Sequence, residues 1–475
     1  MKLKTLGLGL MAAAALAACD SPLDTNPSAS VPANEALDTP QELGVAVNGL
    51  YDAFQDNGVD FNRNLLVFPE LYADNLDFFD TYVSDQEVEN HDVTSTNTGV
   101  SGLWRGAYDG INRANEILQA IPVVEELTPA QADQFRGEAL FVRGAMYLVL
   151  SQFFGGVPLV ETPTRGIPTR EQAEVERSTL AQTYALVERD LREARSLLDA
   201  PLFAGRAGYD AATALLARMN LYAGDHADAY AFSNEIIQSG RYTLVSDYAA
   251  NWRNKNGPES ILELQYTVND PSSFSGWFNP QGRFSFSPSA ALFFSYFVPV
   301  TEDGDSVRYD AERGDFNVAE SPGGAVYSAK YFRIESSDDN FILLRLAEQY
   351  LIRAEAAARL GMLSQAISDL NVVRNRATAY DGDGEVVSGP GPVPAWVNTQ
   401  EEVLLAVLDE RQRELAMEGH RFFDLRRLRD LPLVDDYLFG GSGFPGLYDG
   451  TFRLLFPIPQ TELDANELLQ QNPGY

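Results

Sequence analysis

The stretch TPAQADQFRGEALFVRGAMYLVLSQFFGGVP, residues 128–158, decides the fold class. Its first residues are typical of a helix start, because Thr128 offers a capping hydroxyl, Pro129 suits the first turn and Gln131 follows three residues after the cap. Apolar side chains then recur at steps of three and four, at Ala139, Val142, Met146, Val149 and Phe153. This spacing puts them on one face of a long helix, which the glycines and proline of residues 155–158 end.

The same periodicity returns in two pairs of segments. Small and apolar residues form facing stripes before and after Gly224-Asp225, and again before and after Gly361; the stripes are residues 214–221 with 229–236, and 344–358 with 367–373. Small residues in a first helix, a glycine turn and a returning helix are typical of tetratricopeptide units. The two pairs are too divergent and too far apart in sequence for a regular array. We therefore predict a mainly α fold, a tetratricopeptide-like helical bundle with inserts.

Two more helices are expected outside the pairs. Residues 177–198 form an amphipathic segment, and a long helix begins at Thr399, where Glu402 completes a capping box, and runs to Gly419. Charged residues crowd on and just after this helix: Glu410, Arg411, Arg413, Glu414, Glu418, Arg421 and Asp424. They allow either an acid–base site or an ion-pair network, and their spacing favours a network that docks the helix on the bundle.

Residues 241–340 and 378–398 interrupt the helical pattern. They are rich in glycine, proline, asparagine and aromatic residues, and residues 260–266 have a β-like pattern. Long irregular inserts on a rigid scaffold are where binding residues tend to lie. We expect these slightly β inserts to form the ligand-binding side of residues 41–475.

Composition excludes several classes of protein. The chain has 475 residues, and 68 acids against 35 bases give a net charge of −33, so no nucleic-acid partner is predicted. One cysteine and three scattered histidines exclude disulfides within the chain and Cys-based zinc sites. Asp381 to Glu385 begins like a calcium loop, but Val386 and Pro392 stand where that motif needs Gly and Glu. Neither a metal nor a cofactor is predicted.

The first residues form a targeting segment. Lys2 and Lys4 precede the apolar residues 6–16, which are too few to span a bilayer. Leu16-Ala17-Ala18-Cys19 then resembles the bacterial lipobox. The resemblance implies a signal peptide at residues 1–18 and a lipid anchor on Cys19, with a diacylglycerol and an amide-linked acyl chain. Residues 19–40, rich in Ser, Pro, Asn and Asp, are expected to be a lipidated tether. A plain secretory signal is the weaker alternative, since the chain's one cysteine occupies the lipidation position.

Sequence blocks then follow in a characteristic order: LDTNP at 23–27, NGLY at 48–51, INRAN at 111–115, FFGGVPL at 153–159, RLAE at 345–348, ERQREL at 410–415, EGHRFFDLR at 418–426, FPIP at 456–459 and QNPGY at 471–475. In this order, behind a lipobox, they resemble the SusD/RagB family of nutrient-uptake lipoproteins over nearly the whole mature chain. The resemblance implies a lipid-anchored outer-membrane protein that faces the cell exterior and is not an enzyme. Such proteins capture oligosaccharides, or in some members peptides, and act as the lid of a SusC-like TonB-dependent transporter.

Candidate ligand residues follow from the chemistry of sugars. Sugar rings stack their C–H faces on flat aromatics and bind their hydroxyls to polar side chains. Two stretches and one later tyrosine offer such groups: Asp74, Asn75, Asp77 and Phe78; Trp277, Phe278, Asn279 and Arg283; and Tyr296. The alternative is that the insert's aromatics fill its own small core. This alternative is favoured for Phe284, Phe286 and Phe293, whereas for Trp277 and Asn279 the two interpretations are about equally supported.

Two rival functions stay open on the residues alone. An anchored polysaccharide hydrolase would use a pair of the many carboxylates, although glycosidases usually have β-rich or barrel folds. A helical-repeat scaffold without a small ligand would leave Trp277 without a role in binding. The GSGFPG segment at residues 441–446 satisfies a dinucleotide-binding pattern, but no strand–helix unit surrounds it.

Overall fold

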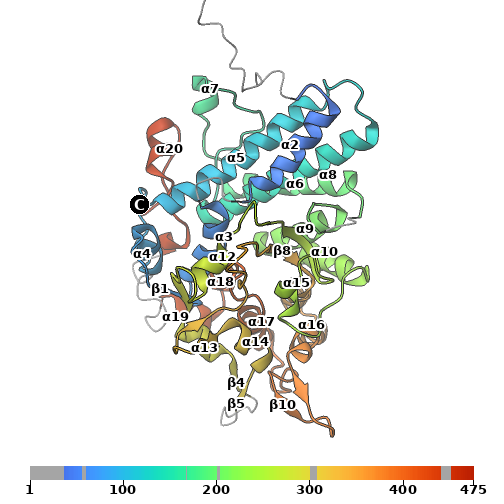
Figure 1. Ribbon diagram of the computed structural model, residues 1–475, viewed down its shortest axis with the longest axis vertical. Helices are drawn as coiled ribbons and strands as arrows, with labels where there is room; N and C mark the ends of the chain where they lie inside the picture. Colours follow the sequence, from blue (N-terminus) through green and yellow to red (C-terminus); the bar gives the residue numbers. More distant parts are fainter. Residues whose placement is uncertain (1–36, 56–59, 167, 201–203, 300–306, 440–450) are drawn as a thin grey trace, which may run out of the picture.

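The computed structural model describes residues 37–55, 60–166, 168–200, 204–299, 307–439 and 451–475 (Figure 1). The predicted signal peptide and Cys19 lie outside the described residues, as does most of the predicted tether. Helices dominate the described part, and the strands are short, which confirms the mainly α prediction. In the same part of the chain, no helix is both long and apolar enough to cross a membrane.

The long helices α2 (Pro40–Asp52), α5 (Thr98–Ala120), α6 (Pro129–Phe154) and α8 (Leu180–Leu197) form the upper bundle of Figure 1. The same N-terminal region contains α3 (Phe61–Leu71) and α4 (Val83–Glu89), which lie lower in that view, and the short α7 (Arg170–Ala173). The predicted start of α6 is confirmed, because the hydroxyl of Thr128 accepts the N–H of Gln131 while the Gln131 side chain accepts the N–H of Thr128. The helix ends at Gly155, where the predicted stop lies. Its predicted apolar residues are buried, except Val149, which is half-buried.

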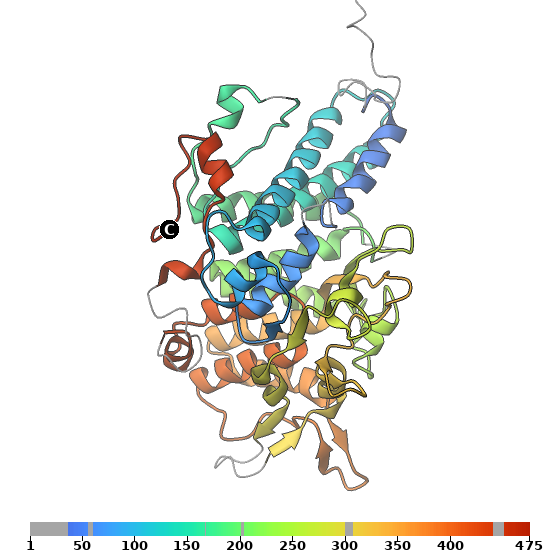
Figure 2. The same ribbon diagram turned by 60° about the vertical axis from the view of Figure 1, so that its left-hand side comes forward.

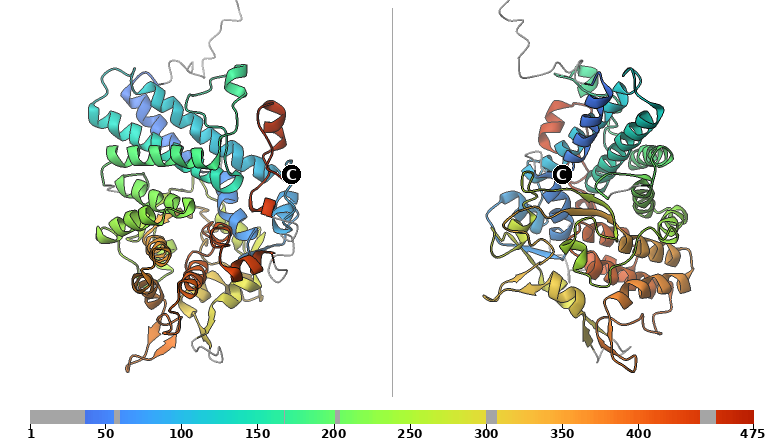
Figure 3. Two further views of the ribbon diagram at one scale, coloured as in Figure 1. Left: turned by 180° about the vertical axis from the view of Figure 1, so that it is seen from behind. Right: turned by 45° about the vertical axis from the view of Figure 1, so that its right-hand side comes forward.

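The two predicted helix pairs are α9 (Tyr209–Ala223) with α10 (His226–Gln238), and α15 (Leu346–Arg359) with α16 (Leu363–Arg376). Each turn has a glycine in the left-handed region, Gly224 at φ 82° and Gly361 at φ 78°, which side chains with a Cβ rarely adopt. The pairs are distant in sequence, yet α10 packs against α15, so α6, α8, α9, α10, α15 and α16 form one continuous stack (Figures 2 and 3). This stack is the tetratricopeptide-like part of the fold.

Helix α17 (Gln400–Glu414) covers α15 and α16. Its start has the predicted Thr399–Glu402 capping box, but it ends at Glu414, short of the predicted Gly419. Beyond the helix the backbone makes a turn in which Met417 and Gly419 both adopt positive φ, at 57° and 81°. The turn lets the N–H groups of Met417, Gly419 and His420 donate to the buried carboxylate of Glu70. The C-terminal region continues with α18 (Arg421–Arg427), α19 (Pro432–Phe439), the 3₁₀ helix η1 (Thr451–Leu454) and α20 (Gln460–Ala465).

The inserts contain the remaining short elements. Residues 241–340 hold α11 (Ala250–Arg253), α12 (Phe274–Phe278), α13 (Ala290–Ser295) and α14 (Ala311–Asn317), with strands β2 (Ser260–Leu264), β3 (Phe286–Pro288), β4 (Phe297–Pro299), β5 (Val307–Tyr309), β6 (Ala319–Glu320) and β7 (Val326–Tyr327). The predicted strand is β2, which pairs antiparallel with β8 (Phe341–Arg345). Residues 378–398 contain the hairpin of β9 (Ala379–Tyr380) and β10 (Val386–Ser388).

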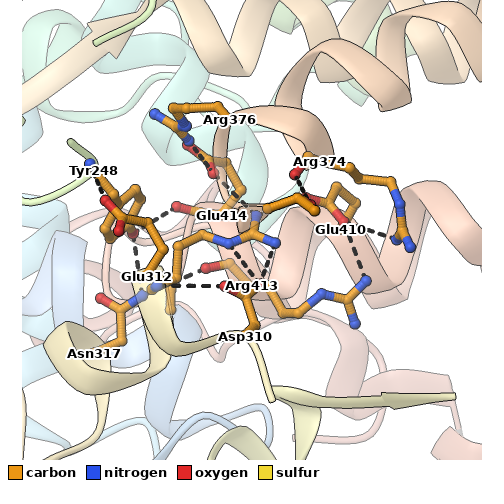
Figure 4. A network of polar contacts seen from close by, with 12 residues as sticks. Tyr248, Asp310, Glu312, Asn317, Arg374, Arg376, Glu410, Arg413 and Glu414 are labelled. Atoms are coloured by element: carbon orange, nitrogen blue, oxygen red, sulfur yellow. Dashed lines mark hydrogen bonds and ion pairs between the residues drawn. The ribbon is translucent and has the colours of Figure 1, made fainter. Parts of the chain in front are cut away.

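A buried network of ion pairs joins α17 to the insert and to the α15–α16 pair, as the sequence predicts. Glu414 contacts the guanidinium groups of Arg313, Arg345 and Arg376, and Glu410 contacts those of Arg313, Arg374 and Arg413. Figure 4 shows the ion pairs of Glu410 with Arg374 and Arg413 and of Glu414 with Arg376. Buried guanidinium groups neutralise both carboxylates, so we interpret the network as structural.

Candidate ligand-binding surface

One strand pair brings the two predicted ligand stretches together. Strand β1 (Leu76–Phe78) pairs antiparallel with β3, and Phe78 lies opposite Phe286. The N–H of Phe79 then donates to the carbonyl of Ser285, which extends the contact to the start of the loop before α4. As a result, Trp277 on α12 lies beside residues that precede it by about two hundred positions.

Trp277 is half-buried and rests on a buried cation. The guanidinium carbon of Arg63, on α3, lies 4.7 Å from the centroid of the Trp277 ring and 5.0 Å from that of Phe286. Arg63 is itself held by Asp85, whose Oδ2 accepts from Nη2 at 2.6 Å. Burial raises the pKa of Asp85, although Arg63 counteracts this effect. The indole is therefore fixed from one side, which preorganises its remaining exposed part.

A second ring and a second cation lie on the solvent side. The Tyr82 ring lies 6.2 Å from the Trp277 ring at an interplanar angle of 55°. The guanidinium of Arg283 lies 4.3 Å from the centroid of Tyr82 and 5.6 Å from that of Trp277. Arg283 also forms an ion pair with Asp80, and this hydrogen-bonded contact holds the pKa of Asp80 well below its usual range. Arg283 is thus held between two rings by a carboxylate that stays ionised.

We call these residues, Phe79, Asp80, Tyr82, Trp277 and Arg283, the Trp277 surface. Its aromatic groups are open to solvent, since Phe79 is 63% exposed and Tyr82 is 41% exposed. Two inclined rings beside a fixed guanidinium match the needs of a sugar chain, whose successive rings offer C–H faces and hydroxyl edges. Among the described residues, no group of three or more His, Cys, Asp or Glu side chains is placed to hold a metal ion.

Several predicted ligand residues belong to the interior. Phe78, Phe278, Asn75 and Tyr296 are buried. The ring of Phe278 stacks on Tyr331 with centroids 5.5 Å apart, and the hydroxyl of Tyr296 donates to the carbonyl of Arg413. Asn75 donates to Glu70 and accepts from Gln412. Burial puts these four side chains out of reach of a ligand on the surface, which corrects the expectation that they contact one.

The other predicted residues divide between structure and surface. Asp74 forms a bidentate ion pair with Arg421, whose Nε and Nη2 donate to the two carboxylate oxygens at 2.6 and 2.8 Å. Asp74 also accepts a hydrogen bond from the hydroxyl of Tyr437. Asp77 is exposed on β1, and the half-buried Asn279 uses its Oδ1 to accept the N–H of Gln281. Trp277 and Arg283 alone among the predicted residues join the Trp277 surface.

Sequence reasoning missed Arg63, Asp80 and Tyr82. Asp80 and Tyr82 directly follow the predicted stretch, so an extension by four residues would have included them. Arg63 carries no comparable signal, because its role depends on the packing of α3 beneath α12.

Comparison with known proteins agrees with this fold over both halves of the chain. Residues 324–475 match the family model described as "SusD family", and residues 23–221 match the model described as "Starch-binding associating with outer membrane". The chain belongs to the SusD/RagB family. It is 24% identical to SusD-like protein P38 of Formosa agariphila, over 98% of this chain and 97% of that protein. It is also 24% identical to the starch-binding protein SusD of Bacteroides thetaiotaomicron, over 74% of each chain.

Solved SusD-like structures share the fold. A SusD superfamily protein from Bacteroides vulgatus superposes with a TM-score of 0.78 at 22% identity, over 92% of this chain and 100% of that one. A laminarin-binding SusD-like protein superposes with a TM-score of 0.74 at 23% identity, again over 92% and 100%. Of these relatives, SusD of Bacteroides thetaiotaomicron is described as starch-binding and one solved structure as laminarin-binding. The model that matches residues 23–221 is described as associating with the outer membrane.

Proposed function

We propose that this protein captures carbohydrate oligomers at the outer membrane and delivers them to a SusC-like TonB-dependent transporter, for which it serves as the lid. In this proposal a lipid on Cys19 anchors the protein, which faces the cell exterior and catalyses no reaction. The Trp277 surface is the observation that carries the proposal. It holds two solvent-facing rings and a cation in fixed positions, and SusD relatives bind starch and laminarin.

Binding is tested by isothermal titration calorimetry of the full chain with maltohexaose, laminarihexaose and a hexapeptide. The hexapeptide represents the second candidate ligand class. We expect one of the two glycans to bind, and Trp277→Ala to weaken that binding by roughly two- to twelvefold, since a stacked aromatic contributes about 0.5–1.5 kcal/mol. Trp396→Ala is the matched control, because Trp396 is 37% exposed and lies in the other insert.

Trp277 also packs on Arg63 and Phe286, so its removal lowers stability as well. Tyr82→Ala separates the two effects, since Tyr82 is more exposed and its loss leaves the Arg63 contact intact. Unchanged glycan affinity in both variants would contradict the assignment of this surface. Hydrolysis of either hexasaccharide by pure protein, lost on replacing one carboxylate, would favour the hydrolase instead.

Anchoring and partnership need a separate experiment. Affinity purification from solubilised outer membranes is expected to recover a TonB-dependent barrel with the full chain. Cys19→Ser is expected to release the protein from the membrane fraction, and protease treatment of intact cells to digest the anchored form. Retention of the serine variant with lipid, or repeated absence of a barrel, would count against the proposal.

A further inference from the structure

One buried ion pair connects the two parts of the chain that carry the rings of the Trp277 surface. Arg63 lies on α3, and its Nη2 donates to Oδ2 of Asp85, on α4, at 2.6 Å. Both side chains are almost fully buried, with exposed fractions of 6% and 1%. Helices α3 and α4 are thus joined by a charged contact that salt screens only weakly.

Asp85 holds the segment that carries Tyr82. Tyr82 directly precedes α4, and its carbonyl accepts the N–H groups of Asp85 and Gln86 at 3.2 and 3.1 Å. Asp85 therefore lies in the first turn of the helix that begins after Tyr82. Because Arg63 binds the Asp85 side chain, this turn, and the backbone of Tyr82 with it, is tied to α3.

Arg63 also holds the other ring. Its guanidinium carbon lies 4.7 Å from the centroid of Trp277, and its Nη1 donates to Oδ1 of Asn64 at 2.7 Å. The guanidinium therefore has two hydrogen-bonded anchors and faces an indole, to which a desolvated cation is attracted by the ring quadrupole. A single side chain thus connects Asp85 on α4 to Trp277 on α12.

The pair is poorly suited to a purely stabilising role. Arg63 Nε and Asp85 Oδ1 are buried, and neither has a hydrogen-bond partner among the described residues. Two buried charges recover their desolvation cost only when their remaining donors and acceptors are also satisfied. Burial raises the pKa of Asp85 as well, which reflects the cost of keeping its charge in the interior. Two apolar side chains of similar volume are therefore expected to replace the pair without loss of stability.

A second link between the rings lies on the solvent side. Arg283 contacts the rings of Tyr82 and Trp277 and forms an ion pair with Asp80. The Arg283 side chain is 45% exposed, and such exposed pairs contribute little and are screened by salt. Of the two charged links, the buried pair is therefore the tighter constraint on the rings.

We infer that Arg63 and Asp85 are positioning residues of the Trp277 surface. Their ion pair sets the distance and the tilt between the Trp277 and Tyr82 rings, and with them the affinity for a carbohydrate oligomer. Both residues act through the rings, which are held 6.2 Å apart at 55° before a ligand arrives, so that binding does not have to order them. The inference rests on the proposed function, because it gives these residues a role beneath the same surface.

The test is calorimetric titration of the full chain with maltohexaose and laminarihexaose. Arg63→Met/Asp85→Leu removes both charges at once, so no charge is left buried alone. We expect the affinity for the glycan that the parent binds to fall about threefold or more, while the melting temperature stays within about 2 °C of the parent. Arg63→Lys should retain most of the affinity, because it keeps a cation between Asp85 and the indole.

Two comparisons separate positioning from a general effect on the fold. In the Trp277→Ala background, the same double replacement should change the affinity less than about 1.5-fold, because the ring to be positioned is absent. Arg353→Met/Asp369→Leu is the matched control, since these residues form an ion pair of similar burial between α15 and α16, at 2.6 Å. Its glycan affinity should equal that of the parent.

Three results would overturn the inference. In the first, the Arg63→Met/Asp85→Leu chain binds its glycan as tightly as the parent, which would leave the proposed function standing. In the second, the double replacement weakens binding equally with and without Trp277, so that its effect does not pass through the rings. In the third, the double variant unfolds or melts well below the parent, which would make the pair structural. Absence of glycan binding by the parent would instead refute the proposed function, and this inference with it.

Discussion

Replacement of Glu414 by Gln should destabilise the protein by several kcal/mol. Glu414 is fully buried, and its carboxylate lies 2.7 Å from Arg345 Nη1 and 3.1 Å from Arg313 Nη1, with Arg376 in contact on the same side. Glutamine keeps the size of the side chain but removes its charge. Three buried guanidinium groups then share one carboxylate fewer, and none of them can reach water.

Loss of one partner from a buried ion pair costs about 3–5 kcal/mol, because the remaining charge stays desolvated. Unfolding entropy amounts to about 2.1 cal/mol/K per residue, or roughly 1 kcal/mol/K for a chain of 475 residues. The expected fall in melting temperature is therefore about 3–5 °C.

Differential scanning calorimetry at pH 7 measures this fall. Glu401→Gln is the matched control, since Glu401 is exposed in the first turn of the same helix. Its loss should cost less than about 1 kcal/mol, the usual contribution of a helix-end charge. A Glu414→Gln variant that melts within 1 °C of the parent would refute the view that this network needs its full set of carboxylates.

Two further predictions concern acid and the core. Burial alone would raise the pKa of Glu410, but Arg313, Arg413 and Arg374 lower it to about 2, so its contribution to stability is complete above its ordinary value of 4.5 and is lost as the pH falls toward 2. The difference in melting temperature between the parent and Glu410→Gln should therefore become smaller as the pH is lowered from 6 to 3. A difference that stays constant over this range would contradict the stabilising role of the Glu410 charge. Leu351→Ala should cost about 2–5 kcal/mol in urea unfolding, because Leu351 is fully buried between α15, α16 and α17, while the exposed Val372→Ala should cost under about 0.5 kcal/mol.

The helices were largely predictable from sequence because their signals are local. A capping box such as Thr128–Gln131 and an apolar stripe each depend on residues within a few turns of one another. The end of α17 was not predictable in this way. Its last turn is unwound so that backbone N–H groups reach Glu70, a residue more than three hundred positions earlier.

The ligand surface was predicted only in part for the same reason. The sequence identifies flat and polar side chains, but exposure depends on which other segments cover them. Phe278 and Trp277 are neighbours on α12, yet Tyr331 covers Phe278 while Trp277 stays half-open above Arg63. The β1–β3 pairing then decides that Tyr82 joins Trp277.

The sequence by itself determined the helical class, the helix starts, the two glycine-turned pairs and the resemblance to an outer-membrane family, because all of these depend on local patterns and ordered motifs. Only the tertiary structure decided that α10 packs on α15, that Glu410 and Glu414 hold a buried charge core, and that Trp277 lies at the surface beside Tyr82. Those features depend on contacts between residues far apart in the chain, and such contacts exist only after burial has selected which side chains remain at the surface.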